Sequence, residues 1–299
     1  MVDPVKGIYH RRKSQYTHTG KIALCCIAKM ENEYIRFFVD YYRKLQFDKI
    51  FIYDNNNSEG ERFEEVISDY IGKQYVEIID FRGRKIAQLA AYQDCYDRHN
   101  KEYDWIAFFD CDEFLTFADQ TNEIHSFLNQ KKFMSFQVIH INWKIYGDNE
   151  LLDNDGRSVV ERFKDPVLPL DFMTRGVPWN KSIKSIVRGG LSKVSYNVSA
   201  HTPVSKYYHC CNSEGVAVKI NSPIQEIEFK TIFLRHYRTK SIGEWVRNKM
   251  VRGFADQPDS SWKQILTLNH FFEYNRITKE KLDYANKVME ELKANSKHR

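Results

Sequence analysis

Short apolar runs alternate with amphipathic segments through the first 110 residues of the chain. Runs that begin near residues 22, 49, 75 and 105 have the length of buried strands. The segments between them place apolar residues at helical spacing, at residues 32–45, 59–71 and 86–99. Strand and helix units at this spacing favour parallel strands joined by crossover helices. The first half therefore predicts an α/β fold with a mostly parallel sheet flanked by helices.

The second half of the chain is less regular. Residues 135–141 alternate as in a half-buried strand, and further short strands are expected at 183–187, 207–211 and 231–234. Stretches rich in Gly, Pro, Asp and Asn predict loops, at residues 147–160 and 164–180. Helical spacing returns at 241–252 and 278–294. We expect a basic arm over residues 1–20, one domain over 21–253, and a helical extension over 254–299.

Composition and charge narrow the class of protein. Hydrophobic residues make up 42% of the 299 residues and aromatic residues 14%, which argues against disorder. The formal net charge is +5, and basic residues are concentrated in segments 1–30 and 230–253. Such local patches favour phosphate ligands or an anionic membrane surface, whereas a nucleic-acid binder usually spreads its basic charge over a face. We therefore expect no nucleic-acid partner.

Cysteine spacing and the lack of long apolar runs predict a cytosolic protein. Four of the six cysteines form adjacent pairs, and the sequence contains no CxxC motif, so we expect buried, reduced thiols. No apolar run approaches the roughly 20 residues that span a bilayer, and the first residues lack the apolar stretch of a signal peptide.

Two polar segments follow predicted strands and are candidates for a ligand site. Asp110 and Asp112 end the fourth strand, where two carboxylates at i and i+2 can bind one Mg²⁺ or Mn²⁺. The alternative is a polar strand exit whose carboxylates cap the next turn. Asp54 begins an Asn-rich segment after the second strand, which is either a nucleotide-binding wall or a turn that bonds its own backbone.

Several motifs occur in an order that is typical of one enzyme group. The string CCIAKMENEYIRFFVDYYRKLQFDKIFIYDNNNSE is followed by WIAFFDCDEFL, and further matches lie at residues 142–147, 161–163, 184–187, 234–241 and 249–253. Together they resemble the glycosyltransferase family 2 and family 92 group over about residues 21–253. The resemblance implies a GT-A-type, Rossmann-like fold with a nucleotide-sugar half over 21–118 and an acceptor half over 119–253.

The same resemblance implies roles for individual residues. Asp110 and Asp112 would form the metal-binding DxD motif, and His236 would be the late histidine that completes the metal site; a buried structural histidine is the alternative. Arg238 and Lys240 would neutralise the leaving diphosphate. The remaining donor-site residues are expected to be Ala28, Lys29, Glu31, Asp54, Arg84, Gln88 and Cys111.

The expected reaction is transfer of a sugar from a UDP-sugar to a glycan or lipid-linked acceptor. The resemblance favours inversion, for which a carboxylate must take the proton of the acceptor hydroxyl. Glu161 is the first candidate for this base and Asp171 the second, although an ion pair with Arg162 or Lys164 explains Glu161 equally well. Because the chain shows no membrane anchor, we expect a bacterial-type cytosolic enzyme of surface polysaccharide or lipopolysaccharide synthesis, with peripheral contact to the inner membrane face.

Two other functions remain open. A nucleotidyltransferase shares strand-end carboxylates and a nucleotide pocket, but it usually carries a Gly-rich phosphate loop, and the corresponding residues 28–32 contain no glycine. A non-catalytic module that binds nucleotide sugars or glycans is the second alternative. A P-loop ATPase is excluded because the GxxxxGK[ST] motif is missing.

Overall fold

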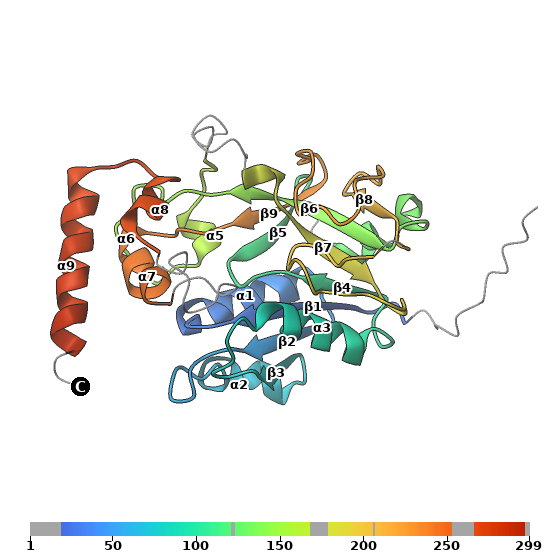
Figure 1. The fold of residues 1–299 in the computed structure, drawn as a ribbon, viewed down its shortest axis with the longest axis horizontal. Helices are drawn as coiled ribbons and strands as arrows, with labels where there is room; N and C mark the ends of the chain where they lie inside the picture. The colour runs from blue at the N-terminus through green and yellow to red at the C-terminus, as the bar shows by residue number, and fades with distance from the viewer. Residues whose placement is uncertain (1–18, 121–122, 168–178, 206, 253–265, 297–299) are drawn as a thin grey trace, which may run out of the picture.

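The computed structural model describes residues 19–120, 123–167, 179–205, 207–252 and 266–296. Its centre is one nine-stranded sheet with the order β3-β2-β1-β4-β7-β6-β9-β5, in which β8 pairs with β6 outside this path. Helices cover the sheet, and the C-terminal helices gather at one end of the molecule, at the left of Figure 1. None of the described helices is long and apolar enough to cross a membrane.

The first four strands form the parallel half of the sheet. They are β1 (Ile22–Ala28), β2 (Lys49–Asp54), β3 (Val76–Asp80) and β4 (Trp105–Phe108), and β1 lies between β2 and β4. All three pairings among them are parallel. The helices between them are α1 (Asn32–Lys44), α2 (Glu64–Gly72) and α3 (Gln88–His99). The predicted order of strands and helices is confirmed, although α2 begins five residues later than expected.

Alternation along β1 decides which helices cover which face. Leu24 and Cys26 belong to the core that includes α1 and α2, whereas Ala23 and Cys25 belong to the core under α3. Successive side chains of a strand point to opposite faces, so a strand buried on both sides is apolar at every position. All six cysteines are buried and free, as the sequence predicts.

The second half extends the sheet with antiparallel pairs. Its strands are β5 (Glu113–Phe117), β6 (Val138–Ile145), β7 (Ile183–Arg188), β8 (Cys210–Asn212) and β9 (Ile232–His236). β7 is antiparallel to β4 and β6, and β9 is parallel to β6 but antiparallel to β5. Short helical turns connect them: α4 (Ile124–Leu128), η1 (Lys131–Phe133), α5 (Val159–Arg162) and η3 (Trp179–Lys181). The sequence did not predict β5, because its partner β9 lies more than 110 residues further along the chain.

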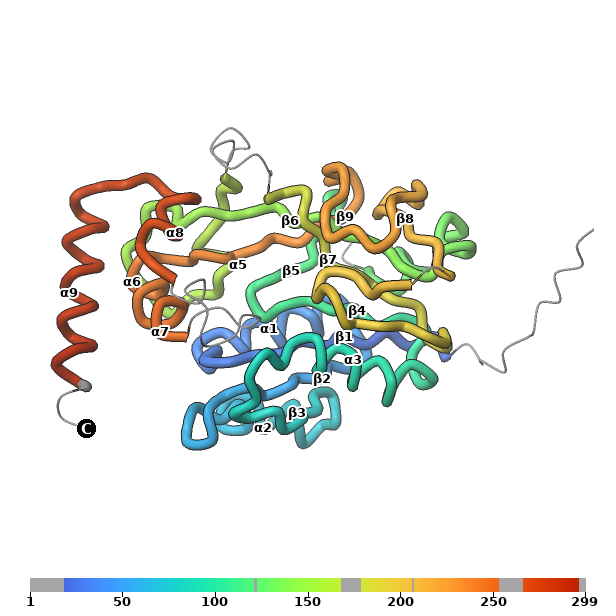
Figure 2. The backbone as a smooth tube through the Cα atoms, viewed as in Figure 1, coloured from blue at the N-terminus to red at the C-terminus, as the bar shows by residue number. Residues whose placement is uncertain are grey.

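The C-terminal segment forms a small core of its own. It comprises α6 (Ile242–Glu244), the π-helical η4 (Trp245–Lys249), α7 (Met250–Arg252), α8 (Leu268–Phe272) and α9 (Lys279–Ser296). Trp245, Phe271 and Val288 lie in one apolar cluster that joins these helices. The tube in Figure 2 shows α5 beside α6 and α7, although about 80 residues separate them in sequence. The proposed boundary near residue 253 stays a prediction.

Candidate active site

Three of the predicted site segments lie where the parallel strands β1, β2 and β4 end. The register of β1 and β2 pairs Ala28 with Asp54, so the segments that follow both strands start side by side. Asp110 and Asp112 come directly after β4, which pairs with the other side of β1. In open α/β sheets, ligands bind at the carboxyl ends of the strands. The fold thus brings the three candidate segments to one edge.

One carboxylate oxygen of Asp110 accepts hydrogen bonds from three side chains. Its Oδ1 lies 2.7 Å from the Gln88 amide, 2.7 Å from the Tyr92 hydroxyl and 2.8 Å from Lys184 Nζ. Burial opposes ionisation of Asp110, but Lys184 and the hydrogen bond from Tyr92 together lower the pKa of this carboxyl. Gln88, expected in the donor site, therefore contacts the DxD motif itself. These donors fix the orientation of Asp110.

Glu113 holds the turn between the two aspartates. Its Oε2 accepts a hydrogen bond from the Asp110 backbone N–H at 2.9 Å, and its Oε1 lies 3.9 Å from Lys184 Nζ. Both Glu113 and Lys184 are almost fully buried. Burial raises the pKa of Glu113 well above its usual value, and Lys184 only partly offsets the effect. Glu113 thus shapes the backbone of the motif while Asp110 carries the charge.

Asp112 faces a lysine on one side and a histidine on the other. Lys249 Nζ donates to Asp112 Oδ2 at 2.7 Å, and His236 Nε2 lies 3.6 Å from Asp112 Oδ1. The register of β5 and β9 pairs Glu113 with His236, which explains how the histidine reaches the motif. Burial would raise the pKa of Asp112, but Lys249 and His236 hold it well below its usual value. Asp112 is therefore ionised.

The pair formed by Asp112 and His236 fits a divalent cation. Two ligands about 2.1 Å from one small cation lie roughly 3.0 to 4.2 Å apart, and the two side chains are separated by 3.6 Å. Carboxylate oxygen and imidazole nitrogen both suit Mn²⁺. Among the residues that the structure describes, no three His, Cys, Asp or Glu side chains form a metal-binding group. The ligand set of Asp110, Asp112 and His236 stays a prediction, with phosphate oxygens of the donor as further ligands.

A group of cations lies beside Asp112. Glu31 is buried between Lys240 Nζ at 3.1 Å and Arg252 Nη1 at 2.7 Å, and Arg252 also donates to the Lys29 carbonyl. Burial disfavours the charged form of Glu31, yet Lys240 and Arg252 lower its pKa. With Lys249, three cations face only two carboxylates here. The excess positive charge favours an anionic ligand.

The segment after β2 is held by its own polar groups. Arg82 contacts Asp54 Oδ2 at 2.5 Å, and the Asn56 backbone N–H donates to Asp54 Oδ1 at 2.9 Å. Asn56 in turn accepts a hydrogen bond from the Met30 N–H at 2.8 Å. Asp54 therefore braces the segment that contains Lys29 and Glu31. Whether it also contacts a nucleobase stays a prediction.

The other predicted residues occupy more varied places. Ala28 and Cys111 are buried, and burial raises the pKa of the Cys111 thiol well above its usual value. The Arg84 guanidinium lies 3.9 Å from the centre of the Phe81 ring, on the exposed side of its loop. Arg238 lies over the rings of Trp179 and Tyr274 at 5.2 and 5.5 Å. Their donor-binding roles stay predictions.

The two candidate bases have different outcomes. Glu161 is exposed, and its carboxylate accepts hydrogen bonds from the Ser158 N–H and hydroxyl at 3.1 and 2.7 Å, as part of the capping box of α5. Its carboxylate is thus bonded to its own helix. Of the two partners in the alternative ion pair, Arg162 binds Glu244 instead. Asp171 lies outside the described residues.

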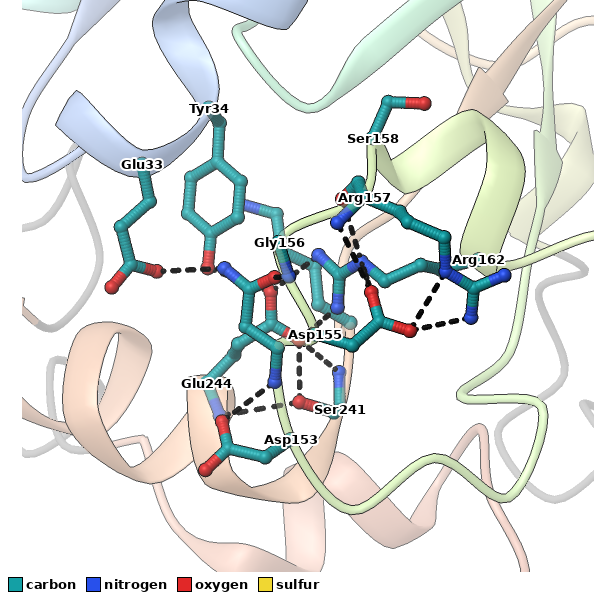
Figure 3. A network of polar contacts seen from close by, with 12 residues as sticks. Glu33, Tyr34, Asp153, Asp155, Gly156, Arg157, Ser158, Arg162, Ser241 and Glu244 are labelled. Atoms are coloured by element: carbon teal, nitrogen blue, oxygen red, sulfur yellow. Dashed lines mark hydrogen bonds and ion pairs between the residues drawn. The ribbon is translucent and has the colours of Figure 1, made fainter.

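A buried polar network connects α5 to the basic C-terminal segment (Figure 3). Arg162 makes two hydrogen bonds of 2.8 Å to Glu244, and both side chains are almost fully buried. Glu244 also accepts a hydrogen bond from the Tyr34 hydroxyl of α1 at 2.7 Å. Glu244 lies five residues before Lys249. The network therefore fixes the position of the segment that carries Lys249 and Arg252.

Sequence reasoning assigned no role to several residues that the structure brings to the site. They are Glu113, Tyr92, Lys184, Lys249, Arg252 and His201. Lys184 had a detectable signal, because it is the only charged residue of the short predicted strand at 183–187. Glu113, Lys249 and Arg252 lie in the matched motifs, but the sequence did not show which residues they contact, and Tyr92 and His201 lie in no matched motif.

The chain is similar to several known proteins. A rice protein (Oryza sativa subsp. japonica) named as a glycosyltransferase family 92 protein is 26% identical over 109 residues, which are 36% of this chain but only 18% of the rice protein. Staphylococcus aureus TarS in complex with UDP-GlcNAc has a TM-score of 0.38 at 13% identity, over 90% of this chain and 79% of TarS. The mannosyltransferase PcManGT from Pyrobaculum calidifontis, in complex with GDP-Man and Mn²⁺, has a TM-score of 0.30 at 6% identity, over 40% of this chain and 35% of PcManGT.

The family match covers most of the chain. The model for glycosyltransferase family 92 matches residues 23–275, which include every strand that the structure describes except the first residue of β1. The mixed α/β architecture, with its mostly parallel sheet between helices, is the GT-A-type fold that the sequence resemblance implied. The chain belongs to glycosyltransferase family 92.

Proposed function

We propose that this protein transfers a sugar from a UDP-sugar to a glycan or lipid-linked acceptor, with inversion and with a divalent cation. Because the chain belongs to this family, one structural observation is enough to support the proposal. Asp112, ionised and buried at the end of β4, lies between His236 and a group of three cations formed by Lys240, Lys249 and Arg252. This arrangement suits a diphosphate better than a neutral ligand.

The cations have a direct role in the reaction. The acceptor oxygen attacks the anomeric carbon, the bond from that carbon to the phosphate oxygen breaks, and its electron pair stays on the diphosphate. Lys240, Lys249 and Arg252 stabilise this charge where it develops, in a buried site from which most water is excluded. Asp112 and His236 would hold the divalent cation, which supplies Lewis-acid stabilisation of the same oxygens.

A thermal-shift experiment tests the donor site. The melting temperature is measured with UDP, GDP and CMP, each with Mn²⁺ and with EDTA. A ligand that binds only the native state stabilises it by about 2.7 kcal/mol at one hundred times its dissociation constant. We expect an increase with UDP and Mn²⁺ that EDTA abolishes, and a screen of UDP-sugars follows from that result.

The variant Asp112→Asn separates this site from non-specific binding of UDP. It should lose the increase with UDP and Mn²⁺, whereas Asp283→Asn, an exposed carboxylate on α9, should keep it. An equal increase in melting temperature with UDP in EDTA would show that UDP binding does not depend on a metal held by Asp112 and His236. No increase with any nucleotide would contradict the proposed function and favour a module that binds glycans.

A further inference from the structure

His201 lies next to the proposed site although no sequence motif points to it. The Trp143 ring contacts both histidines, with ring centres 5.1 Å from His201 and 4.2 Å from His236. His201 is therefore one indole ring away from the pair of Asp112 and His236. Its other neighbours are β7 residues beside Lys184, the lysine that binds Asp110.

The backbone and the ring of His201 are both held in place. The Ser185 hydroxyl donates to the His201 carbonyl at 2.7 Å, and the His201 N–H donates to the Ser199 hydroxyl at 3.1 Å. The ring nitrogen Nδ1 lies 2.8 Å from the Ile183 carbonyl oxygen. Thr202, the next residue, is buried and bonded to His140 at 3.0 Å. A side chain restrained in this way is oriented before any ligand arrives.

The hydrogen bond to Ile183 decides which ring nitrogen of His201 carries the proton. A carbonyl oxygen only accepts hydrogen bonds, so Nδ1 must be the donor, and in the neutral ring Nε2 then has a free lone pair. No hydrogen bond joins Nε2 to another of the residues that the structure describes. His201 is half-buried, and with Nδ1 bonded to Ile183, Nε2 is the ring nitrogen that is left to bind a ligand.

The charges around His201 keep the ring neutral. Burial and Lys184 lower its pKa to about 4, while the Ile183 carbonyl and Asp110 act in the opposite direction and His236 lowers it further. These groups come from β7, from the turn after β4, and from β9. At neutral pH, His201 is thus an uncharged hydrogen-bond acceptor of roughly carboxylate basicity.

We propose that His201 is the catalytic base of the transfer, an inference that rests on the proposed function. Its Nε2 accepts the proton of the acceptor hydroxyl as that oxygen attacks the anomeric carbon. The sugar–phosphate bond breaks with its electron pair on the diphosphate, and the imidazolium formed is stabilised by Nδ1–H donation to Ile183. The proton passes to solvent when product leaves. The role that the sequence assigned to Glu161 would fall to this histidine.

The first test needs no activity. Histidine ring nitrogens of the ¹⁵N-labelled full chain are observed by long-range ¹H–¹⁵N NMR at pH 7, with His201 assigned by its absence in His201→Asn. We expect a neutral ring with the proton on Nδ1. A charged ring, or a proton on Nε2, would overturn the proposal, because Nε2 would have no lone pair to accept a proton.

The second test measures transfer. UDP release is followed with UDP-glucose, UDP-galactose and UDP-N-acetylglucosamine and simple methyl glycosides as acceptors. His201→Asn keeps a donor for Ile183 but lacks Nε2, and loss of a general base lowers kcat by about 10²–10⁴-fold. The stabilisation by UDP and Mn²⁺ should remain, and the residual rate should rise with hydroxide concentration. His209→Gln, at an exposed histidine eight residues further along the chain, serves as the matched control.

The outcomes separate this inference from the proposed function. Failure of the wild-type chain to bind UDP contradicts the proposed function, while the NMR experiment still decides the state of His201. If UDP binds, an unchanged kcat in His201→Asn overturns the inference. The inference is also overturned if Glu161→Gln loses transfer while His201→Asn keeps it. A His201→Asn variant that has lost UDP binding as well assigns a structural role to the residue and also overturns it.

Discussion

At the scale of single residues, the site consists of buried charges that each face an opposite charge. Glu31 lies between Lys240 and Arg252, Asp112 contacts Lys249, and Lys184 contacts Asp110. A buried ion pair adds little net stability, but removal of one partner is costly because the other charge stays buried. These residues are therefore sensitive positions for folding as well as for ligand binding.

The variant Glu31→Gln tests this view through its pH dependence. Because the pKa of Glu31 is lowered in the folded state, its stabilising effect is complete above the unfolded pKa of about 4.3 and is lost as the pH falls through the lower folded-state value. Glu31→Gln should lower the free energy of unfolding at pH 7 by about 3 kcal/mol. Glu31→Gln should also make the free energy of unfolding fall less steeply as the pH decreases below the unfolded pKa of about 4.3.

Urea unfolding of both proteins between pH 3 and pH 7 measures the effect. The control is Glu290→Gln, an exposed residue on α9. Parallel pH profiles for Glu31→Gln and the wild type would show that this carboxylate does not contribute to acid unfolding.

At the scale of elements, local patterns predicted the regular part of the fold and missed its irregular part. β1 to β4 and α1 to α3 are apolar or amphipathic over enough residues to be recognised. The expected helix over 241–252 instead contains a π-helical turn at Trp245–Lys249, followed by α7. π-helical turns are frequent at functional sites, and this one ends at Lys249, which contacts Asp112. The local sequence does not reveal the turn, because the contacts of Lys249 are tertiary.

The contact between α5 and α6 can be tested by substitution of Arg162, the α5 residue that binds Glu244 of α6. Arg162→Met leaves the Glu244 carboxylate buried with fewer partners and should lower the free energy of unfolding by about 3–5 kcal/mol. The double variant Arg162→Met/Glu244→Met should be more stable than the sum of the single effects predicts. Arg157→Met, which removes an exposed pair with Asp155, should change stability little. Strict additivity in guanidinium unfolding would contradict a direct coupling.

At the scale of the whole molecule, the C-terminal helices support the basic side of the site. α9 packs on α6 and η4 through the third apolar cluster, which includes Trp245, Phe271 and Val288. The same segment carries Lys249 and Arg252. We infer that the C-terminal helices are required for donor binding although they lie at one end of the fold (Figure 1).

The variant Val288→Asp tests this dependence. An unpaired charge in the third cluster should detach α9, lower the melting temperature, and weaken UDP binding in the presence of Mn²⁺ by at least about tenfold, which corresponds to about 1.4 kcal/mol. Leu282→Asp, on an exposed position of the same helix, is the control. Calorimetric titration with UDP gives both affinities. Unchanged affinity in a destabilised Val288→Asp protein would show that the two regions are independent.

The sequence by itself determined the order of strands and helices in the first half, the placement of Asp110 and Asp112 at a strand end, and the family. These features depend on periodicity and on short motifs, which a single segment contains in full. Only the tertiary structure decided what each carboxylate faces. Lys184, His236, Lys249 and His201 reach the site from segments 70 to 140 residues away, through strand pairing between β5, β6, β7 and β9 and through the network around Glu244. Contacts of this kind depend on register and packing between distant segments, so no local pattern contains them.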